Sequence, residues 1–213
     1  MAALPVEQET PDPPVDLRLR ALENLTFIRD TMHRASVFSA VPGWGMVGMG
    51  VSALVGGNAA ALRYSADWWI YCWMWVALVG CATGTGAMLL KAKRIGQGVW
   101  TGMGRRAIFS FSPAILAGLI LSEILYELRL EPLMPIVWLM FYGVAVCGGG
   151  AFSVQVVPLL GLCFTLLSMV AYGVIFFTEL GVGILRASDL VLLTGFGGLH
   201  IVFGLIIARY HGG

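Results

Sequence analysis

The chain has 213 residues, of which 58% are hydrophobic and only 12% are charged, and its mean hydropathy is +0.84. Soluble domains carry roughly 25% charged residues, so this composition predicts an integral membrane protein. The formal net charge of +1 argues against the large basic surface that nucleic-acid binding needs, and we expect no nucleic-acid partner.

The N-terminal stretch MAALPVEQETPDPP carries acids and prolines where a cleavable signal would carry basic residues and then an apolar run. The sequence therefore predicts no signal peptide. Over residues 1–14 it predicts a disordered, acidic and proline-rich tail, because such a stretch has too few apolar side chains to form a core.

Residues 15–36 predict an amphipathic helix ahead of the first apolar stretch. Apolar side chains recur there at helical spacing, and most charged residues fall on other sides of the helix. Such a helix lies among lipid headgroups, where anionic lipid attracts its arginines. The alternative is a helix that docks on a cytoplasmic protein or on a second copy of the chain. The apolar stripe is Leu19, Leu22, Leu25, Ile28, Met32 and Ala35, and the arginines are Arg18, Arg20, Arg29 and Arg34.

Six apolar stretches within residues 37–213 are long enough to cross a hydrocarbon layer, which takes about 20 helical residues. Backbone amides cannot stay unpaired in lipid, and the short alternating strands of a barrel are missing, so we expect helices. The fold class is therefore an all-α, polytopic membrane protein. The predicted spans are residues 39–62, 68–90, 107–126, 133–153, 157–178 and 189–208.

The basic residues predict the orientation of these spans. Ten of the 13 lysines and arginines fall on the side that also holds both termini. Cytoplasmic loops are enriched in lysine and arginine, so both termini are expected in the cytoplasm, and the protein in a bacterial inner membrane. The predicted headgroup or partner contacts beyond the first helix are Lys91, Lys93, Arg94, Arg105 and Arg106.

The first, third and fifth spans open alike, as FSAVPGWG, FSFSPAILAG and FSVQVVPLLG. Serine caps a first helical turn, and proline there loses no hydrogen bond. Either one good helix start is used three times, or the bundle consists of three helical hairpins that all enter from the cytoplasm.

The second span opens with DWWIYCWMW, which places five aromatic residues near its outer end. Tryptophan and tyrosine prefer that depth of a membrane, so the residues form an interfacial belt with some side chains packed inward. The alternative is an aromatic wall for a flat ligand, formed by Trp68, Trp69, Trp73 and Trp75.

His200 lies about halfway along the last span, where a polar ring is costly unless it is paired. Counting from the span ends puts Tyr142, Ser168 and Ser52 at a similar depth, so His200 is expected to bond one of them inside the bundle. A second reading makes His200 a proton or ion relay with Glu123, the carboxylate inside the third span. An axial haem ligand is the remotest alternative, because no second histidine lies at that depth.

Motifs of soluble enzymes are missing from the sequence, including the phosphate loop, the G-x-S-x-G elbow and H-E-x-x-H. The four cysteines lie in apolar segments without zinc spacing. We therefore expect no enzymatic activity, no catalytic residue, no metal and no cofactor.

Two blocks, LTFIRDTMHRASVFSAVPGWG and GFGGLHIVFGLIIARYHGG, resemble a set of small, uncharacterised multi-pass bacterial membrane proteins of about this length. The resemblance implies a six-helix membrane fold, and it implies no activity and no site residues.

Together these observations predict a non-enzymatic structural, accessory or signal-coupled membrane module. The alternative is a small transporter or channel with a midplane polar site around His200. A membrane redox or cofactor-binding subunit is a remote third reading. The expected partners are the bilayer, with its anionic headgroups on the cytoplasmic side, and a further protein or a second copy of the chain.

Overall fold

The structure is a computed structural model that describes residues 14–35, 39–62, 65–96, 98–100, 102–177 and 188–211. The tail predicted for residues 1–14 lies outside these ranges, apart from Pro14. The chain divides into two compact units, Met1–Ser36 and Val37–Gly213, and each is described by itself.

The first unit contains a single described helix, α1 (Pro14–Ala35). Proline suits a first helical turn because its missing N–H would have no partner there. The stripe residues Leu22, Leu25, Ile28 and Met32 are all more than half exposed. The helix therefore presents an uncovered apolar side within its own unit. The side chains of Arg18 and Arg34 lie outside the described part of the structure, whereas Arg20 and Arg29 are exposed.

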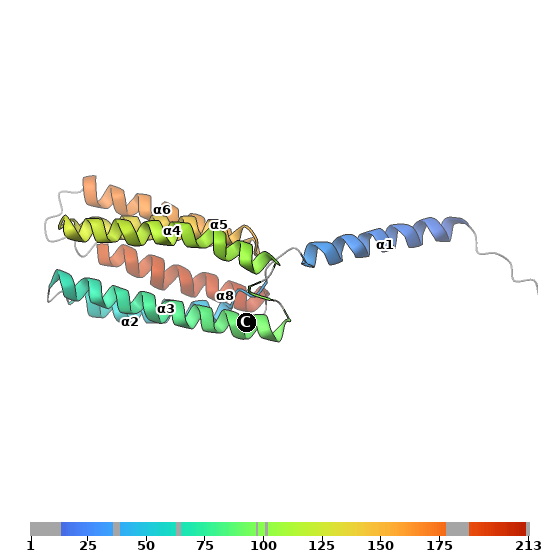
Figure 1. The fold of residues 1–213 in the computed structure, drawn as a ribbon, viewed down its shortest axis with the longest axis horizontal. Helices are drawn as coiled ribbons and strands as arrows, with labels where there is room; N and C mark the ends of the chain where they lie inside the picture. Colours follow the sequence, from blue (N-terminus) through green and yellow to red (C-terminus); the bar gives the residue numbers. More distant parts are fainter. Residues whose placement is uncertain are drawn as a thin grey trace, which may run out of the picture. The chain divides into compact units, whose positions relative to one another are not determined.

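In the second unit every described element is a helix, which confirms the all-α class (Figure 1). The last helical run, Ser188–Tyr210, passes through the π-helical stretch η2 into α8. The elements are α2 (Gly43–Ala60), α3 (Ala66–Arg94), α4 (Gly102–Glu127), η1 (Glu131–Leu133), α5 (Met134–Gly150), α6 (Val156–Phe177), η2 (Leu193–Leu199) and α8 (His200–Tyr210).

Five described helical runs are long and apolar enough to cross a membrane: Ala66–Arg94, Gly102–Glu127, Glu131–Gly150, Val156–Phe177 and Ser188–Tyr210. Helix α2 is not among them, so the predicted count of six spans is not confirmed. Its 18 residues would reach about 27 Å at 1.5 Å per residue, but its glycines and Asn58 lower its hydropathy.

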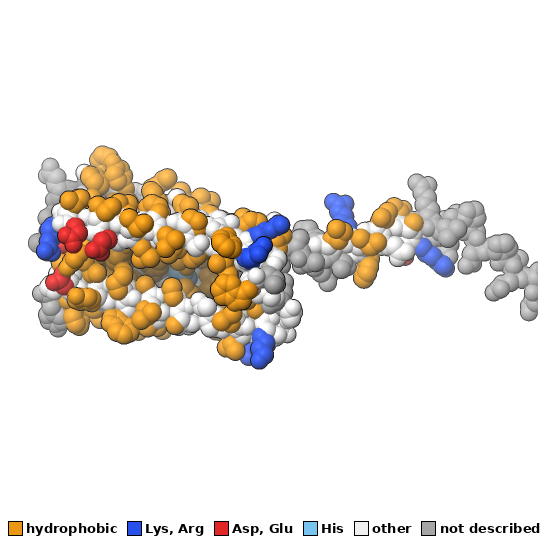
Figure 2. All heavy atoms as spheres, viewed as in Figure 1, with side chains coloured by type: hydrophobic (Ala, Val, Ile, Leu, Met, Phe, Trp, Pro, Cys, Tyr) orange, Lys and Arg blue, Asp and Glu red, His pale blue; other side chains and the backbone are white. Residues whose placement is uncertain are grey.

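The outer surface of the second unit is apolar along most of its length (Figure 2). Leu119 and Ile120 of α4 and Leu166, Met169 and Val170 of α6 are all more than half exposed. Water rarely meets a continuous apolar surface of this kind on a soluble protein. The arrangement suits a bundle surrounded by lipid.

The six long helices of this unit form two groups of three. In one group α2 packs between α3 and the η2–α8 run, and in the other α5 packs between α4 and α6 (Figure 1). The predicted arrangement of three hairpins is not confirmed. The pairs α2–α3 and α4–α5 pack as neighbours, but α6 packs mainly on α5 while α8 packs mainly on α2.

Glycines allow the closest approaches within both groups. A Cβ atom on Gly204 of α8 would lie 2.8 Å from the carbonyl oxygen of Gly43 in α2. One on Gly143 of α5 would lie 2.8 Å from the carbonyl oxygen of Gly161 in α6. Helices in lipid associate through close van der Waals fit, so these contacts hold α2 to α8 and α5 to α6.

Candidate functional site

Tyr142 of α5 and His200 of α8 meet inside the bundle. The Tyr142 Oη atom lies 2.7 Å from His200 Nε2, and His200 Nδ1 lies 3.0 Å from the carbonyl oxygen of Phe196. A carbonyl can only accept, so Nδ1 carries the proton, and in the neutral ring Nε2 accepts from the tyrosine hydroxyl. His200 is 2% exposed, and both of its ring nitrogens are bonded within the bundle.

Aromatic rings surround this pair. Phe164 of α6 meets Tyr142 edge to face at a centroid distance of 4.8 Å and lies 5.3 Å from the His200 ring. Phe196 stacks on the imidazole at 6.2 Å, and Phe111 of α4 meets Tyr142 at 6.3 Å. Four helical runs thus contribute to one aromatic cluster, which seats the polar pair in a rigid apolar shell.

The other predicted members of the midplane site do not hydrogen-bond to this pair in the described part of the chain. Ser168 is fully buried, but its hydroxyl donates to Thr165 O at 2.7 Å, and the Ser52 hydroxyl donates to Met49 O at 2.8 Å. Glu123 lies on the exposed side of α4. Among the described residues, only Tyr142 and the Phe196 carbonyl bond the His200 ring.

The stretch that leads into His200 is π-helical, from Leu193 to Leu199, and contains three glycines. Wide turns of this kind are rare and often occur at functional sites. The turn also leaves the Phe196 carbonyl in reach of His200 Nδ1. Local backbone geometry therefore orients the imidazole.

The predicted aromatic wall divides into two pairs. Trp68 and Trp75 point outward, with 39% and 66% of their surface exposed, whereas Trp69 and Trp73 are 2% and 3% exposed. The inward pair packs on Trp138 of α5, which stacks on Trp69 at 5.4 Å with ring planes 9° apart. The sequence pattern does not indicate Trp138, because the position of a residue along a span gives its depth but not the direction in which its side chain faces.

The two buried indoles differ in their hydrogen bonding. Trp69 Nε1 donates to Asp189 Oδ1 at 2.7 Å, where Asp189 is a buried acid in the first turn of the last helical run. Trp73 Nε1 is buried and has no partner in the described part of the chain. Asp189 was not among the predicted site residues, although an acid at the start of an apolar span is a recognisable signal.

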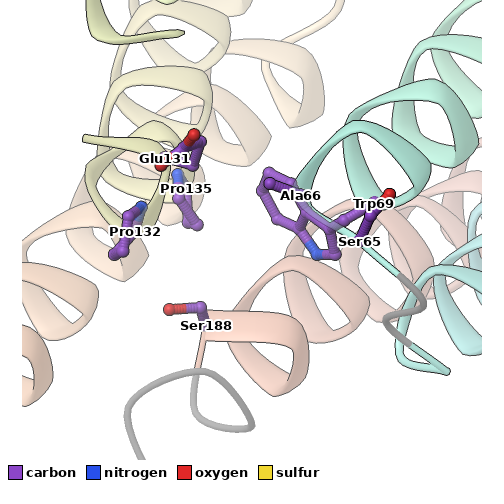
Figure 3. A pocket seen from close by; sticks show the side chains of 7 residues that line it. All are labelled: Ser65, Ala66, Trp69, Glu131, Pro132, Pro135 and Ser188. Carbon is purple, nitrogen blue, oxygen red and sulfur yellow. The ribbon is translucent and has the colours of Figure 1, made fainter. Parts of the chain in front are cut away.

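A cavity of about 260 Å³ lies where three helical runs begin. Figure 3 shows the side chains from η1 and α5 across the cavity from those of α3, with Ser188 between the two sides. The cavity thus lies at the seam between the two helix groups. Its lining consists of Ser65, Ala66 and Trp69, then Glu131, Pro132 and Pro135, and Ser188.

Charge is divided between the two ends of the second unit, as Figure 2 shows. The end with the cavity carries the described acids Asp67, Glu123, Glu127, Glu131 and Asp189, together with Arg129. The opposite end carries Lys91, Lys93, Arg94, Arg105, Arg106 and Arg209. All six are exposed except Lys91, whose ammonium group turns inward and donates to Val41 O at 2.9 Å and His211 O at 3.0 Å.

Within the described residues, no three His, Cys, Asp or Glu side chains come close enough together to hold a metal ion. The described polar groups that bond across helices hold the helices together.

Comparison of the chain with known protein families, with curated proteins and with solved structures finds no match. The fold and the site therefore define the class by themselves: an all-α bundle whose helices are long and apolar enough to cross a membrane.

Proposed function

We propose that this chain is a non-enzymatic membrane module, in which a rigid bundle carries α1 as an element that binds the membrane surface. The observation that carries the proposal is the hydrogen bonding of His200, because both of its ring nitrogens have partners inside the bundle. A relay histidine needs a nitrogen that can exchange its proton with a pathway. Here the ring joins α8 to α5 instead.

In this proposal α2 is a sixth span, because it packs between α3 and α8 and therefore shares their surroundings. The basic end of the bundle faces the cytoplasm of a bacterial cell, as lysine and arginine enrichment favours. Both termini then lie on that side, and α1 lies along the anionic inner leaflet with its stripe toward the acyl chains.

Cysteine labelling tests the placement of α1. Single cysteines replace Leu25 or Ile28 on the stripe and Glu23 on the polar side, in a chain whose four native cysteines are changed to serine or alanine. We expect a water-soluble maleimide to label position 23 rapidly, and positions 25 and 28 at least about tenfold more slowly, in nanodiscs that contain anionic lipid. Removal of the anionic lipid should reduce this protection.

Equal labelling at all three positions would contradict the placement of α1 on lipid. Protection of the stripe only when two copies share one nanodisc would replace lipid with a second copy of the chain as the occupant.

The orientation has its own test. Lys93→Cys and Glu127→Cys place exposed thiols at opposite ends of the bundle. In intact sphaeroplasts we expect an impermeant maleimide to label position 127 at once, and position 93 only after the membrane is permeabilised. The reverse pattern would invert the proposed topology, and labelling of both positions in intact cells would argue against a spanning bundle.

A transporter or channel is the second candidate, and the π-helical stretch before His200 favours it, because such turns often occur at functional sites. Proteoliposomes that contain a pH-sensitive dye test it. If the protein gives a proton flux above that of empty vesicles, and if His200→Asn lowers this flux, a transporter or channel would be favoured over a non-enzymatic module.

A further inference from the structure

We propose that the cavity at the acidic end of the bundle binds the ammonium group of a small organic cation. The cavity lies between Trp69 of α3 and Glu131 of η1 (Figure 3). Neither Tyr142 nor His200 belongs to its lining.

The walls suit an alkylated ammonium group. Ala66, Pro132 and Pro135 supply apolar surface, and Trp69 supplies an aromatic ring. Quaternary and protonated amines bind where aromatic and apolar walls meet one counter-charge, since their methyl or methylene groups are poorly hydrated.

Trp69 is held in place at the cavity wall. Its ring stacks on Trp138 at 5.4 Å, and its Nε1 donates to the Asp189 carboxylate at 2.7 Å. Donation to an anion pushes electron density into the indole, which strengthens the attraction between the ring and a cation. The Asp189 bond therefore also fixes the position of the ring.

Charge selects the sign of the ligand. Glu131 lines the cavity, and the other described acids at this end are Asp67, Glu123, Glu127 and Asp189. The described arginine of this end, Arg129, lies 5.5 Å from the centre of the Tyr126 ring. Carboxylates at the starts of helices also offset the positive ends of the helix dipoles, which would otherwise favour an anion.

Size limits the ligand. A volume of about 260 Å³ is just below the roughly 300 Å³ at which pockets for drug-sized ligands begin. The cavity therefore admits a small amine, or the ammonium group of one lipid headgroup.

Fluorine NMR tests the proposal on the full-length protein labelled with 5-fluorotryptophan. The chain has seven tryptophans, and the Trp69 resonance is identified by its loss in Trp69→Phe. The protein is placed in phosphatidylglycerol nanodiscs, which contain no ammonium group. Tetramethylammonium chloride is then titrated against sodium chloride at equal ionic strength.

We expect a saturable shift of the Trp69 resonance with tetramethylammonium and none with sodium. Glu131→Gln should weaken binding about fivefold, as the loss of one partly solvated charge contact does. Glu127→Gln is the matched control outside the cavity and should leave binding unchanged. Ala66→Leu fills the cavity without a change of charge and should abolish the shift, so the test does not depend on the folding of the Glu131 variant.

A second nanodisc composition identifies the source of the cation. If a lipid headgroup occupies the cavity, the Trp69 resonance is already displaced in phosphatidylcholine nanodiscs. If a free amine is the ligand, both compositions start alike. The proposal is overturned if no shift is specific to tetramethylammonium, if Ala66→Leu leaves the shift intact, or if sodium sulfate produces it instead.

Discussion

The Tyr142 hydroxyl donates a hydrogen bond to His200 Nε2 across the boundary between the two helix groups, and the two atoms lie 2.7 Å apart. Tyr142 belongs to the α4–α5–α6 group and His200 to the α2–α3–α8 group. The bond therefore links the two helix groups inside the bundle, and the bond from the Tyr126 hydroxyl to Asp67 Oδ1 links them at the acidic end.

Tyr142→Phe should destabilise the bundle by about 1 kcal/mol, in the range measured for hydrogen bonds between membrane helices. The buried Nε2 atom of His200 loses its donor and gains no replacement. Thermal unfolding in detergent measures the change. His200→Phe combined with Tyr142→Phe should be less destabilised than the sum of the two single variants, because removal of both partners leaves no polar atom unpaired. Full additivity would show that the bond contributes nothing.

Trp69→Phe and Trp73→Phe form a matched pair, since both indoles are buried and lie one turn apart on α3. Only Trp69 has a described partner for its N–H group, the Asp189 carboxylate. We expect Trp69→Phe to lower the free energy of unfolding by about 1.5–3 kcal/mol more than Trp73→Phe does, the value of a hydrogen bond to a charged group. Urea unfolding followed by circular dichroism gives the difference, and equal losses would refute this reading.

Gly204→Ala should destabilise the contact between α2 and α8 by about 1–3 kcal/mol, the usual cost of an added methyl group in a tight contact. The new Cβ atom would meet the carbonyl oxygen of Gly43 at 2.8 Å and the amide nitrogen of Val47 at 2.9 Å, and neither backbone atom can rotate away. Gly86→Ala in α3 is the control, because nothing lies within 4 Å of its Cβ position. The midpoint of thermal unfolding should fall for the first variant and not for the second.

Lys91→Met should loosen the C-terminal end of α8. The ammonium group donates to the carbonyls of Val41 and His211, and so ties three chain segments together at the basic end. Bonds of this kind contribute about 1.5–3 kcal/mol. Hydrogen exchange of the amides in the last turn of α8 should accelerate at least about tenfold. Lys93→Met, which changes an exposed lysine two residues along, should leave the exchange rates as they are.

The sequence predicted the depth of a residue along its span better than the direction in which its side chain faces. Counting from the span ends put His200 and Tyr142 at one level, and the structure joins them. The same count put Ser52 and Ser168 at that level, yet both bond carbonyls of their own helices. Length and hydropathy fix how far along a span a residue lies. They do not fix which side of the helix faces protein, because lipid and the bundle interior are equally apolar.

The lateral order of the helices in the bundle could not be predicted from the sequence either. Nothing in the sequence marks α8 as the partner of α2, because apolar residues occur on every side of both helices. The position of the cavity depends on that lateral order, because Trp69, Glu131 and Ser188 lie in the first turns of three helical runs that are distant in sequence. Aromatic enrichment at the start of α3 pointed to this end of the bundle, but not to Trp138 or Asp189 as the groups that fix Trp69.

The packing of α8 on α2 also sets a schedule for biosynthesis. The side of α2 that packs on α8 emerges from the ribosome about 140 residues before α8 does. At about 5–20 residues per second this is a wait of roughly 7–28 s. During that time α2 is covered by lipid, by the insertion machinery or by α3 alone. A chain that stops before its last helix leaves this surface open, so quality control can distinguish truncated copies from finished ones.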